Sequence, residues 1–167
     1  MLAERVTDTP RPVDLIKPYE QRYSFSCGPA SLHIAYKAYG KDIDEGHIAT
    51  ELEINEEGTT WKAMKEHPSK YGFNTWYKDR SDYEELKAVH DKTGFVQIIG
   101  WTSDRDNDRT KGEPEAHFSV IRRITPTHIM IADPAFANLY TMKKEDFMNK
   151  WFDDEAKRAY LTIVPNI

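Results

Sequence analysis

The chemistry that this sequence can support centres on its single cysteine, Cys27. Pro29 follows it closely and favours the first turn of a helix, so we expect the thiol to lie where a helix begins. The free backbone amides and the dipole of a helix N-terminus favour a thiolate, and a thiolate is a strong nucleophile. We expect Gly28 to leave room for a substrate beside the sulfur.

A cysteine nucleophile needs a base, and of the six histidines His117 has the most suitable setting. It precedes the apolar run 118–121, which is typical of a strand that holds an imidazole at the edge of a cleft. Asp133 ends a second such run, 128–132. The tight connection 125–127 predicts that the two runs pair as antiparallel neighbours, which brings Asp133 beside His117 as its orienting group.

The oxygen of an attacked carbonyl becomes negative and needs hydrogen-bond donors. The backbone N–H of Cys27 is the first candidate, and the side-chain amide of Gln21 is the second. One such donor typically stabilises a transition state by about 3 to 4 kcal/mol. Trp101 ends a predicted strand that leads into a polar loop, and we expect it to form a wall of the cleft.

These motifs resemble those of the papain-like cysteine peptidases that cut leader peptides after a double glycine, the bacteriocin-processing peptidases of cysteine peptidase family 39. The likeness runs through Gln21, Cys27-Gly28-Pro29-Ala30, His117-Phe118-Ser119-Val120-Ile121 and Ile131-Ala132-Asp133-Pro134. It spans roughly Leu15 to Phe152. The resemblance implies that Cys27 is the nucleophile, His117 the base and Asp133 the orienting aspartate. It implies the oxyanion glutamine for Gln21.

Two features depart from the family pattern. Members commonly carry an aspartate directly before the cysteine, whereas this chain has Ser26. The membrane domain and the ATPase of the transporter-fused members are not in this sequence either, so the resemblance is to a stand-alone domain. It implies a peptide or protein substrate and hydrolysis of a peptide bond through a thioester, more than it implies the double-glycine substrate.

Two other functions are compatible with the same residues. An acyl-transferase or transpeptidase would form the same acyl-enzyme on Cys27 and resolve it with an amine. A peptide-binding module of the same fold would perform no turnover, although pure binding does not require Cys27, His117, Asp133 and Gln21 together. A metal site made of Glu113, Glu115 and His117 is disfavoured because Pro114 disturbs the strand. We therefore expect neither a metal nor an organic cofactor.

Composition excludes several other classes. The net charge is −5 and the pI is about 5.7, so nucleic acid and anionic membrane surfaces are poor partners. No apolar run reaches the roughly 20 residues of a membrane helix, and the N-terminus lacks the apolar core of a signal peptide. The single cysteine excludes an internal disulfide. The expected location is cytoplasmic.

The 167 residues suit a single domain, in which an extended arm (1–17) precedes one papain-like peptidase domain (18–167). Apolar periodicity and capping signals predict helices at 29–39, 44–52, 60–67, 82–91 and 144–151. A capping box of Ser81 and Glu84 is expected to start the fourth. Strands are predicted at 95–101, 116–124, 128–132 and 160–164. Helices first and strands later indicate an α+β fold with helices packed on an antiparallel sheet.

A strongly polar stretch, 102–115, lies directly upstream of His117. We interpret it as an exposed loop in preference to a substrate lid.

Overall fold

The computed structural model describes residues 9–105 and 114–166. Residues 1–8 of the predicted arm and residues 106–113 of the polar stretch lie outside this part of the chain. The α-helices are α1 (Cys27–Ala38), α2 (Glu45–Leu52), α3 (Trp61–Glu66), α4 (Tyr83–Thr93) and α5 (Lys144–Lys150), with 3-10 helices at Pro12–Leu15 (η1) and His67–Tyr71 (η2). The strands are β1 (Phe73–Lys78), β2 (Val96–Ser103), β3 (Glu115–Ile124), β4 (His128–Asp133), β5 (Asn138–Lys143) and β6 (Tyr160–Pro165).

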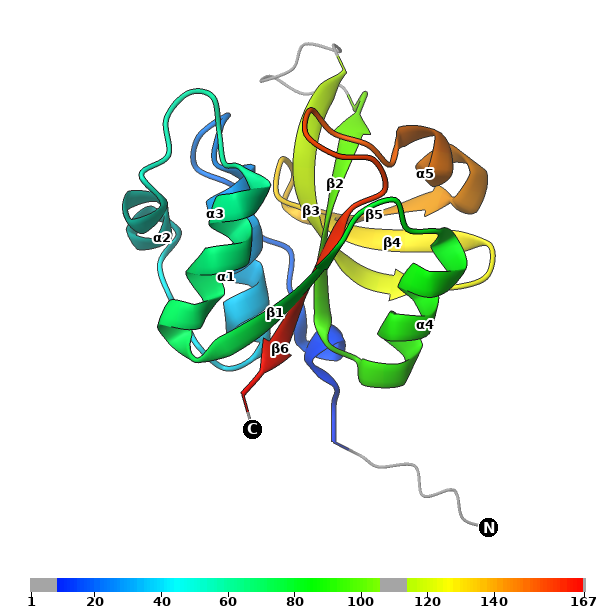
Figure 1. Cartoon of the computed structure of the whole chain (residues 1–167), viewed down its shortest axis with the longest axis horizontal. Helices are drawn as coiled ribbons and strands as arrows, with labels where there is room; N and C mark the ends of the chain where they lie inside the picture. Colours follow the sequence, from blue (N-terminus) through cyan, green and yellow to red (C-terminus); the bar gives the residue numbers. More distant parts are fainter. Residues whose placement is uncertain (1–8, 106–113, 167) are drawn as a thin grey trace.

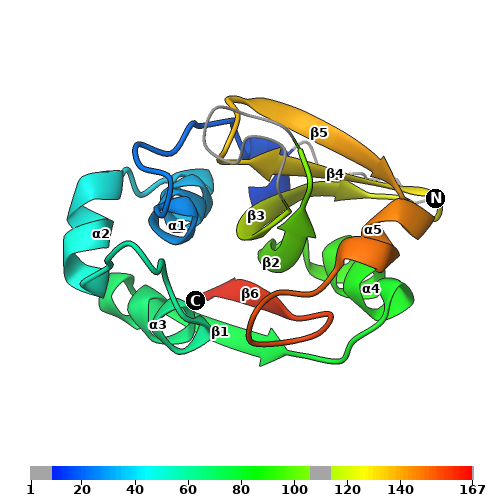
Figure 2. The same cartoon turned by 90° about the horizontal axis from the view of Figure 1, so that it is seen from above.

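The strands form a six-stranded sheet in the order β1-β6-β2-β3-β4-β5, and every neighbouring pair is antiparallel. Helices α1, α2 and α3 lie on one side of the sheet, and α4 and α5 lie on the other (Figures 1 and 2). This arrangement confirms the predicted α+β class.

Alternating side chains of the central strands build a separate core on each face of the sheet. Val96 and Ile98 of β2 pack in the core that contains α1, whereas Ile99 and Trp101 pack in the core that contains α4 and α5. Because side chains alternate along a strand and both faces are covered, β2 is buried along almost its whole length. The first core holds Cys27 at its margin and so links the helix of the cysteine to the sheet.

The predicted helices all form, and side-chain oxygens cap three of them. Asp44 accepts from Gly46 N–H at the start of α2, and Thr60 accepts from Ala63 N–H at the start of α3. The expected cap of α4 was wrong by one residue. Asp82 is the N-cap of α4 and accepts from Glu85 N–H, because its carboxylate faces the free amides of the first turn while Ser81 lies one position outside it.

Strands β1 and β5 were not predicted. Both are edge strands. Exposed and more buried residues alternate along β1, and most residues of β5 are exposed, so neither strand carries a long run of consecutive apolar residues. An edge strand pairs on one side only and needs less apolar sequence than a central strand. Short-range patterns therefore did not reveal them.

The segment before residue 18 is anchored to the domain. Val13 in η1 and the following Ile16 are buried, and Val13 N–H donates to Gly94 O at 3.1 Å. The boundary between an arm and a domain at residue 17 remains a prediction. Among the described residues, no helix has both the length and the apolarity to cross a membrane.

Candidate active site

Cys27 is the first residue of α1, as the sequence predicted for its position. Ser26 does not cap this helix, because its hydroxyl bonds back to the N–H and the carbonyl of Tyr23, each at 3.0 Å. Within the described residues, the Cys27 N–H donates to no acceptor. The Cys27 sulfur accepts a hydrogen bond from Phe118 N–H of β3 at 3.4 Å, which ties the start of the helix to the sheet.

His117 lies next to Phe118 on β3 and is 7% exposed. Its Nε2 is 2.5 Å from Asp133 Oδ1, and the ring interacts electrostatically with the side chain of Cys27. Because Nε2 is hydrogen-bonded to Asp133, Nδ1 is the ring nitrogen left to interact with Cys27. Burial lowers the pKa of His117, but the charge of the Cys27 thiolate and the bond to Asp133 outweigh it and raise the pKa to about 10.

Asp133 ends β4 and is 1% exposed. The pairing of β3 with β4 brings it beside His117, and a bulge between Ile121 and Arg123 shifts the register of this pair. The Ala135 N–H donates to Asp133 Oδ1 at 3.0 Å. Burial raises the pKa of this carboxyl, yet the bonds from His117 and Ala135 and the charge of Arg105 leave the pKa below its ordinary value.

Gln21 is buried near this group but does not line the cavity that holds Cys27. Its backbone N–H donates to Pro134 O at 2.7 Å, which fastens the glutamine segment to the turn after Asp133. The side-chain Nε2 donates to Tyr23 O at 2.7 Å and to Ser24 O at 3.2 Å. Both hydrogens of the amide therefore face backbone carbonyls in this conformation.

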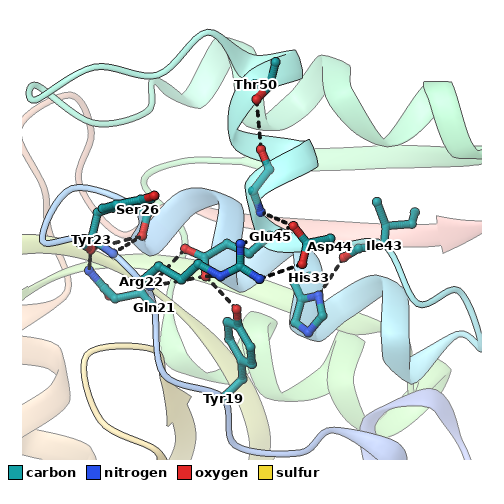
Figure 3. Close-up of polar contacts among 11 residues, drawn as sticks. Tyr19, Gln21, Arg22, Tyr23, Ser26, His33, Ile43, Asp44, Glu45 and Thr50 are labelled. Atoms are coloured by element: carbon teal, nitrogen blue, oxygen red, sulfur yellow. Dashed lines mark hydrogen bonds and ion pairs between the residues drawn. The ribbon is translucent and has the colours of Figure 1, made fainter.

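A buried carboxylate holds the segment that leads to Cys27. Glu45 of α2, 1% exposed, accepts from the hydroxyl of Tyr19 at 2.7 Å and from the backbone N–H of Arg22 at 3.2 Å. The guanidinium of Arg22 reaches Asp44, the N-cap of α2, at 2.6 Å. Figure 3 shows these side chains gathered between the segment of Gln21 and the start of α2. The residues before α1 are thus fixed by α2 as well as by the sheet.

A cavity of about 170 Å³ opens beside the sulfur and is lined by Cys27, by the segment just before α1, by the first residues of β3 including His117 and Phe118, and by the α2–α3 and α5–β6 loops. Its walls carry many carboxylates, and no lysine or arginine is among the described residues that line it. The acidic residues come from the α2–α3 loop, the start of β3 and the α5–β6 loop: Glu56, Glu57, Glu115, Asp153, Asp154 and Glu155. Asp153 and Glu155 also hold Trp61, by its Nε1 and its backbone N–H, each at 2.9 Å.

Two residues expected to contact substrate have different surroundings. Trp101 is fully buried, and its Nε1 donates to Ser119 Oγ at 2.9 Å, so the ring lies beneath His117 and not on the wall of the cavity. Gly28 is buried too. A Cβ at this position would meet Thr59 Oγ1 at 2.5 Å, so the space beside Gly28 is filled by protein and offers no room for a substrate.

Sequence reasoning missed Arg105. The polar stretch was interpreted as an exposed loop, but its described start sends this guanidinium to Asp133, with Nη1 2.8 Å from Oδ2. The sequence offers only a weak sign of this contact, since the aromatic residues that hold the guanidinium, Phe136 and Tyr140, lie more than 30 residues further on.

The alternative metal site includes Glu113, which lies outside the described residues. Its neighbour Glu115 is exposed at the cavity, whereas Nε2 of His117 is hydrogen-bonded to Asp133. Across residues 9–105 and 114–166, no three side chains of His, Cys, Asp or Glu converge as metal ligands would.

Comparison with known proteins gives a family and a fold. The model of the peptidase C39 family matches residues 16–154. The peptidase domain of Streptococcus ComA, described as a bi-functional ABC transporter of a quorum-sensing pathway, is 24% identical, with a TM-score of 0.70 over 90% of this chain and 98% of that one. No match was found among curated protein sequences.

Two other solved structures have the same fold. A double glycine motif protease from an AMS/PCAT transporter, solved with its leader peptide, is 21% identical with a TM-score of 0.70, covering 95% of this chain and 96% of that one. A protein from Bacillus anthracis described as a C39-like peptidase is 14% identical with a TM-score of 0.70, covering 94% and 98%.

Proposed function

The chain belongs to the peptidase C39 family, a family of cysteine peptidases, and from this membership we propose that it hydrolyses peptide bonds with Cys27 as the nucleophile. We assign His117 as the base and Asp133 as the group that orients it. The observation that carries the proposal is the position of the His117 ring, which is hydrogen-bonded to Asp133 through Nε2 and lines the same cavity as Cys27, whose charge it senses.

In the proposed reaction the thiolate of Cys27 attacks the carbonyl carbon of a peptide. As the tetrahedral intermediate collapses, the carbon–nitrogen bond breaks and the proton of His117 Nδ1 passes to the leaving amine. The acyl group remains as a thioester on the sulfur. Water then attacks the thioester, His117 takes a proton from that water, and the carboxylic acid leaves with the thiolate restored.

The oxyanion of each intermediate needs donors at the start of α1. The Cys27 N–H is suited to this role, because it is the first amide of the helix and the dipole is directed along it. Gln21 is the proposed second donor. Its Nε2 now bonds Tyr23 and Ser24, so the role requires one N–H to leave a backbone carbonyl when substrate binds.

The proposed substrate is a peptide that enters the cavity beside Cys27. The double glycine motif protease, which has the same fold, was solved with a leader peptide, and this supports a peptide as the class of ligand. Residues 18–167 are proposed to be the unit that performs the reaction.

A peptide-library digest read by mass spectrometry tests the proposal, with Cys27→Ala as the blank and Ser26→Ala as a matched control in the adjacent residue. We expect new peptide termini with the wild type and with Ser26→Ala, and none with the blank. Equal product with wild type and Cys27→Ala would refute Cys27 as the nucleophile.

The same digest separates hydrolysis from acyl transfer. Repeating it with an added amine, such as hydroxylamine or a glycine amide, should leave free carboxylic acid as the main product. If amide-exchanged product prevails at low amine concentration, the protein is a transferase that uses the same acyl-enzyme.

A further inference from the structure

Arg105 has an unusually complete set of contacts for a residue in a polar stretch. It follows β2 by two positions, and its side chain is 15% exposed. Its guanidinium carbon lies 3.8 Å from the ring centre of Phe136 and 3.8 Å from that of Tyr140. Contact of a guanidinium with aromatic faces is favourable and leaves its edge free for hydrogen bonds.

The edge of the guanidinium meets Asp133. Arg105 Nη1 lies 2.8 Å from Oδ2, while His117 Nε2 lies 2.5 Å from Oδ1. The two oxygens of one carboxylate are thus held by two side chains, one from β3 and one from the segment that follows β2. Rotation of the carboxylate about its Cβ–Cγ bond would break both bonds at once.

We propose that Arg105 is a positioning residue of the peptidase site, which fixes the Asp133 carboxylate toward His117 and keeps it ionised. Phe136 and Tyr140, which flank the guanidinium, hold Arg105 in place. The inference rests on the proposed function, because it assigns Asp133 as the group that orients the base.

The charged groups around Asp133 determine the sign of the effect. Asp133 faces His117 of β3 and Arg105 after β2, and through His117 it senses the thiolate of Cys27 on α1. Arginine does not titrate in proteins, so its charge favours the ionised carboxylate at every working pH. The Arg105 charge also offsets part of the negative charge that Asp133 and Cys27 place around the His117 imidazolium. Loss of Arg105 should therefore move both the acidic and the basic limb of the activity–pH profile to higher pH.

The experiment compares wild type with Arg105→Gln and Arg105→Lys. The first removes the charge and the second keeps it. Asp104→Asn is the matched control, because Asp104 is the adjacent residue and pairs with Lys150 at 2.9 Å. For each variant, kcat and KM are measured between pH 4 and pH 10, together with the rate at which iodoacetamide alkylates Cys27.

Arg105→Gln should lower kcat roughly 10- to 100-fold, as expected for a displaced catalytic group, with KM changed far less. The acidic and basic limbs of its pH profile should shift to higher pH, both for kcat and for the rate of alkylation. Arg105→Lys should keep the wild-type limbs with a smaller loss of kcat, and Asp104→Asn should match wild type. The proposal would be overturned if a folded Arg105→Gln protein had the kcat and the pH profile of wild type. Equal defects in the Gln and Lys variants would also overturn it.

Alkylation separates this proposal from the proposed function. If wild type cleaves no peptide but the alkylation profile shifts in Arg105→Gln, the peptidase assignment fails and the positioning role stands. If wild type cleaves and Arg105→Gln behaves identically, the positioning role fails alone. If Arg105→Gln does not fold, Phe136→Leu replaces it, since it removes one flanking ring and leaves the charges. An unchanged kcat in Phe136→Leu and in Arg105→Lys would then overturn the proposal.

Discussion

The contact between Gly28 and Thr59 leads to a sharp test of how the start of α1 is held. A Cβ at Gly28 would meet Thr59 Oγ1 at 2.5 Å and Thr59 Cβ at 2.7 Å, both closer than packed atoms approach. Thr59 Cβ is attached to the backbone, so the clash cannot be relieved by turning a flexible side chain. In Gly28→Ala the start of α1 and the α2–α3 loop must therefore move apart.

The cost follows from overpacking, which typically destabilises a protein by about 1 to 3 kcal/mol. For a chain of this size, that loss lowers Tm by about 2 to 12 °C. Cys27 is the neighbouring residue, so its sulfur should move relative to His117. A displacement near 1 Å is expected to lower kcat/KM by roughly 100-fold.

Urea unfolding, thermal melts and peptide cleavage measure these effects. Gly46→Ala is the matched control, because Gly46 is also the second residue of its helix, but its added Cβ would meet the end groups of Arg22 and Asp44 at 2.9 Å, which can turn away. We expect this control to lose less stability than Gly28→Ala and to keep its activity, because its clash weakens only the Asp44 cap of α2 and lies away from Cys27. In a double-mutant cycle, Thr59→Gly should recover much of the loss caused by Gly28→Ala. Wild-type stability and activity in Gly28→Ala would refute the reasoning.

Three other features give measurable expectations: the charge pair at the sulfur, the buried carboxylate of Glu45 and the acidic cavity. Burial lowers the pKa of His117 while Cys27 and Asp133 raise it to about 10, so Cys27→Ala should lower this pKa in a ring-proton NMR titration. Because folding raises the pKa of His117, its interactions with Cys27 and Asp133 stabilise the protein fully below about pH 6.5. This stabilisation is lost as the pH rises toward 10. The Cys27→Ala variant should therefore lose less stability than wild type over that pH range. If the pKa of His117 stays at its wild-type value in Cys27→Ala, Cys27 does not raise it and the interaction between the two side chains is refuted. Glu45→Gln should lower the free energy of unfolding by about 1 to 3 kcal/mol in urea, since charge-assisted bonds to Tyr19 and to a backbone amide are weakened, and no change would show that α2 does not hold this segment. Peptides with lysine near the scissile bond should have a higher kcat/KM than peptides with glutamate there, and Glu57→Lys and added salt should each shrink the difference; equal rates for both peptides would exclude an electrostatic role for the cavity.

Much of the fold was accessible from sequence because its signals are local. Gly40 adopts a left-handed φ of 86° just after α1, and Asp44 and Thr60 cap the next two helices, so each helix end is encoded by adjacent residues. The central strands are buried on both faces and appear as apolar runs. Edge strands β1 and β5 lack that signature, since each has only one buried residue and at least half of its residues are exposed.

The placement of the candidate site residues on elements was also predictable. Cys27 starts a helix, His117 lies near the start of a strand and Asp133 ends the next strand. A short connection between two strands brings their facing ends together, which is why the His117–Asp133 neighbourhood followed from the 125–127 turn. Their assigned roles in catalysis remain proposals for the experiments above.

By itself, the sequence determined which residues could do chemistry and on which element each would lie, because caps, turns and hydrophobic periods act over a few neighbouring positions. Only the tertiary structure decided what surrounds them. It buried Trp101 beneath His117, filled the space beside Gly28 with Thr59 and brought Arg105 to Asp133. Gly28 and Thr59 are 31 positions apart, and Arg105 and Asp133 are 28 apart. Such contacts depend on how strands and loops pack in three dimensions, which no short stretch of sequence encodes.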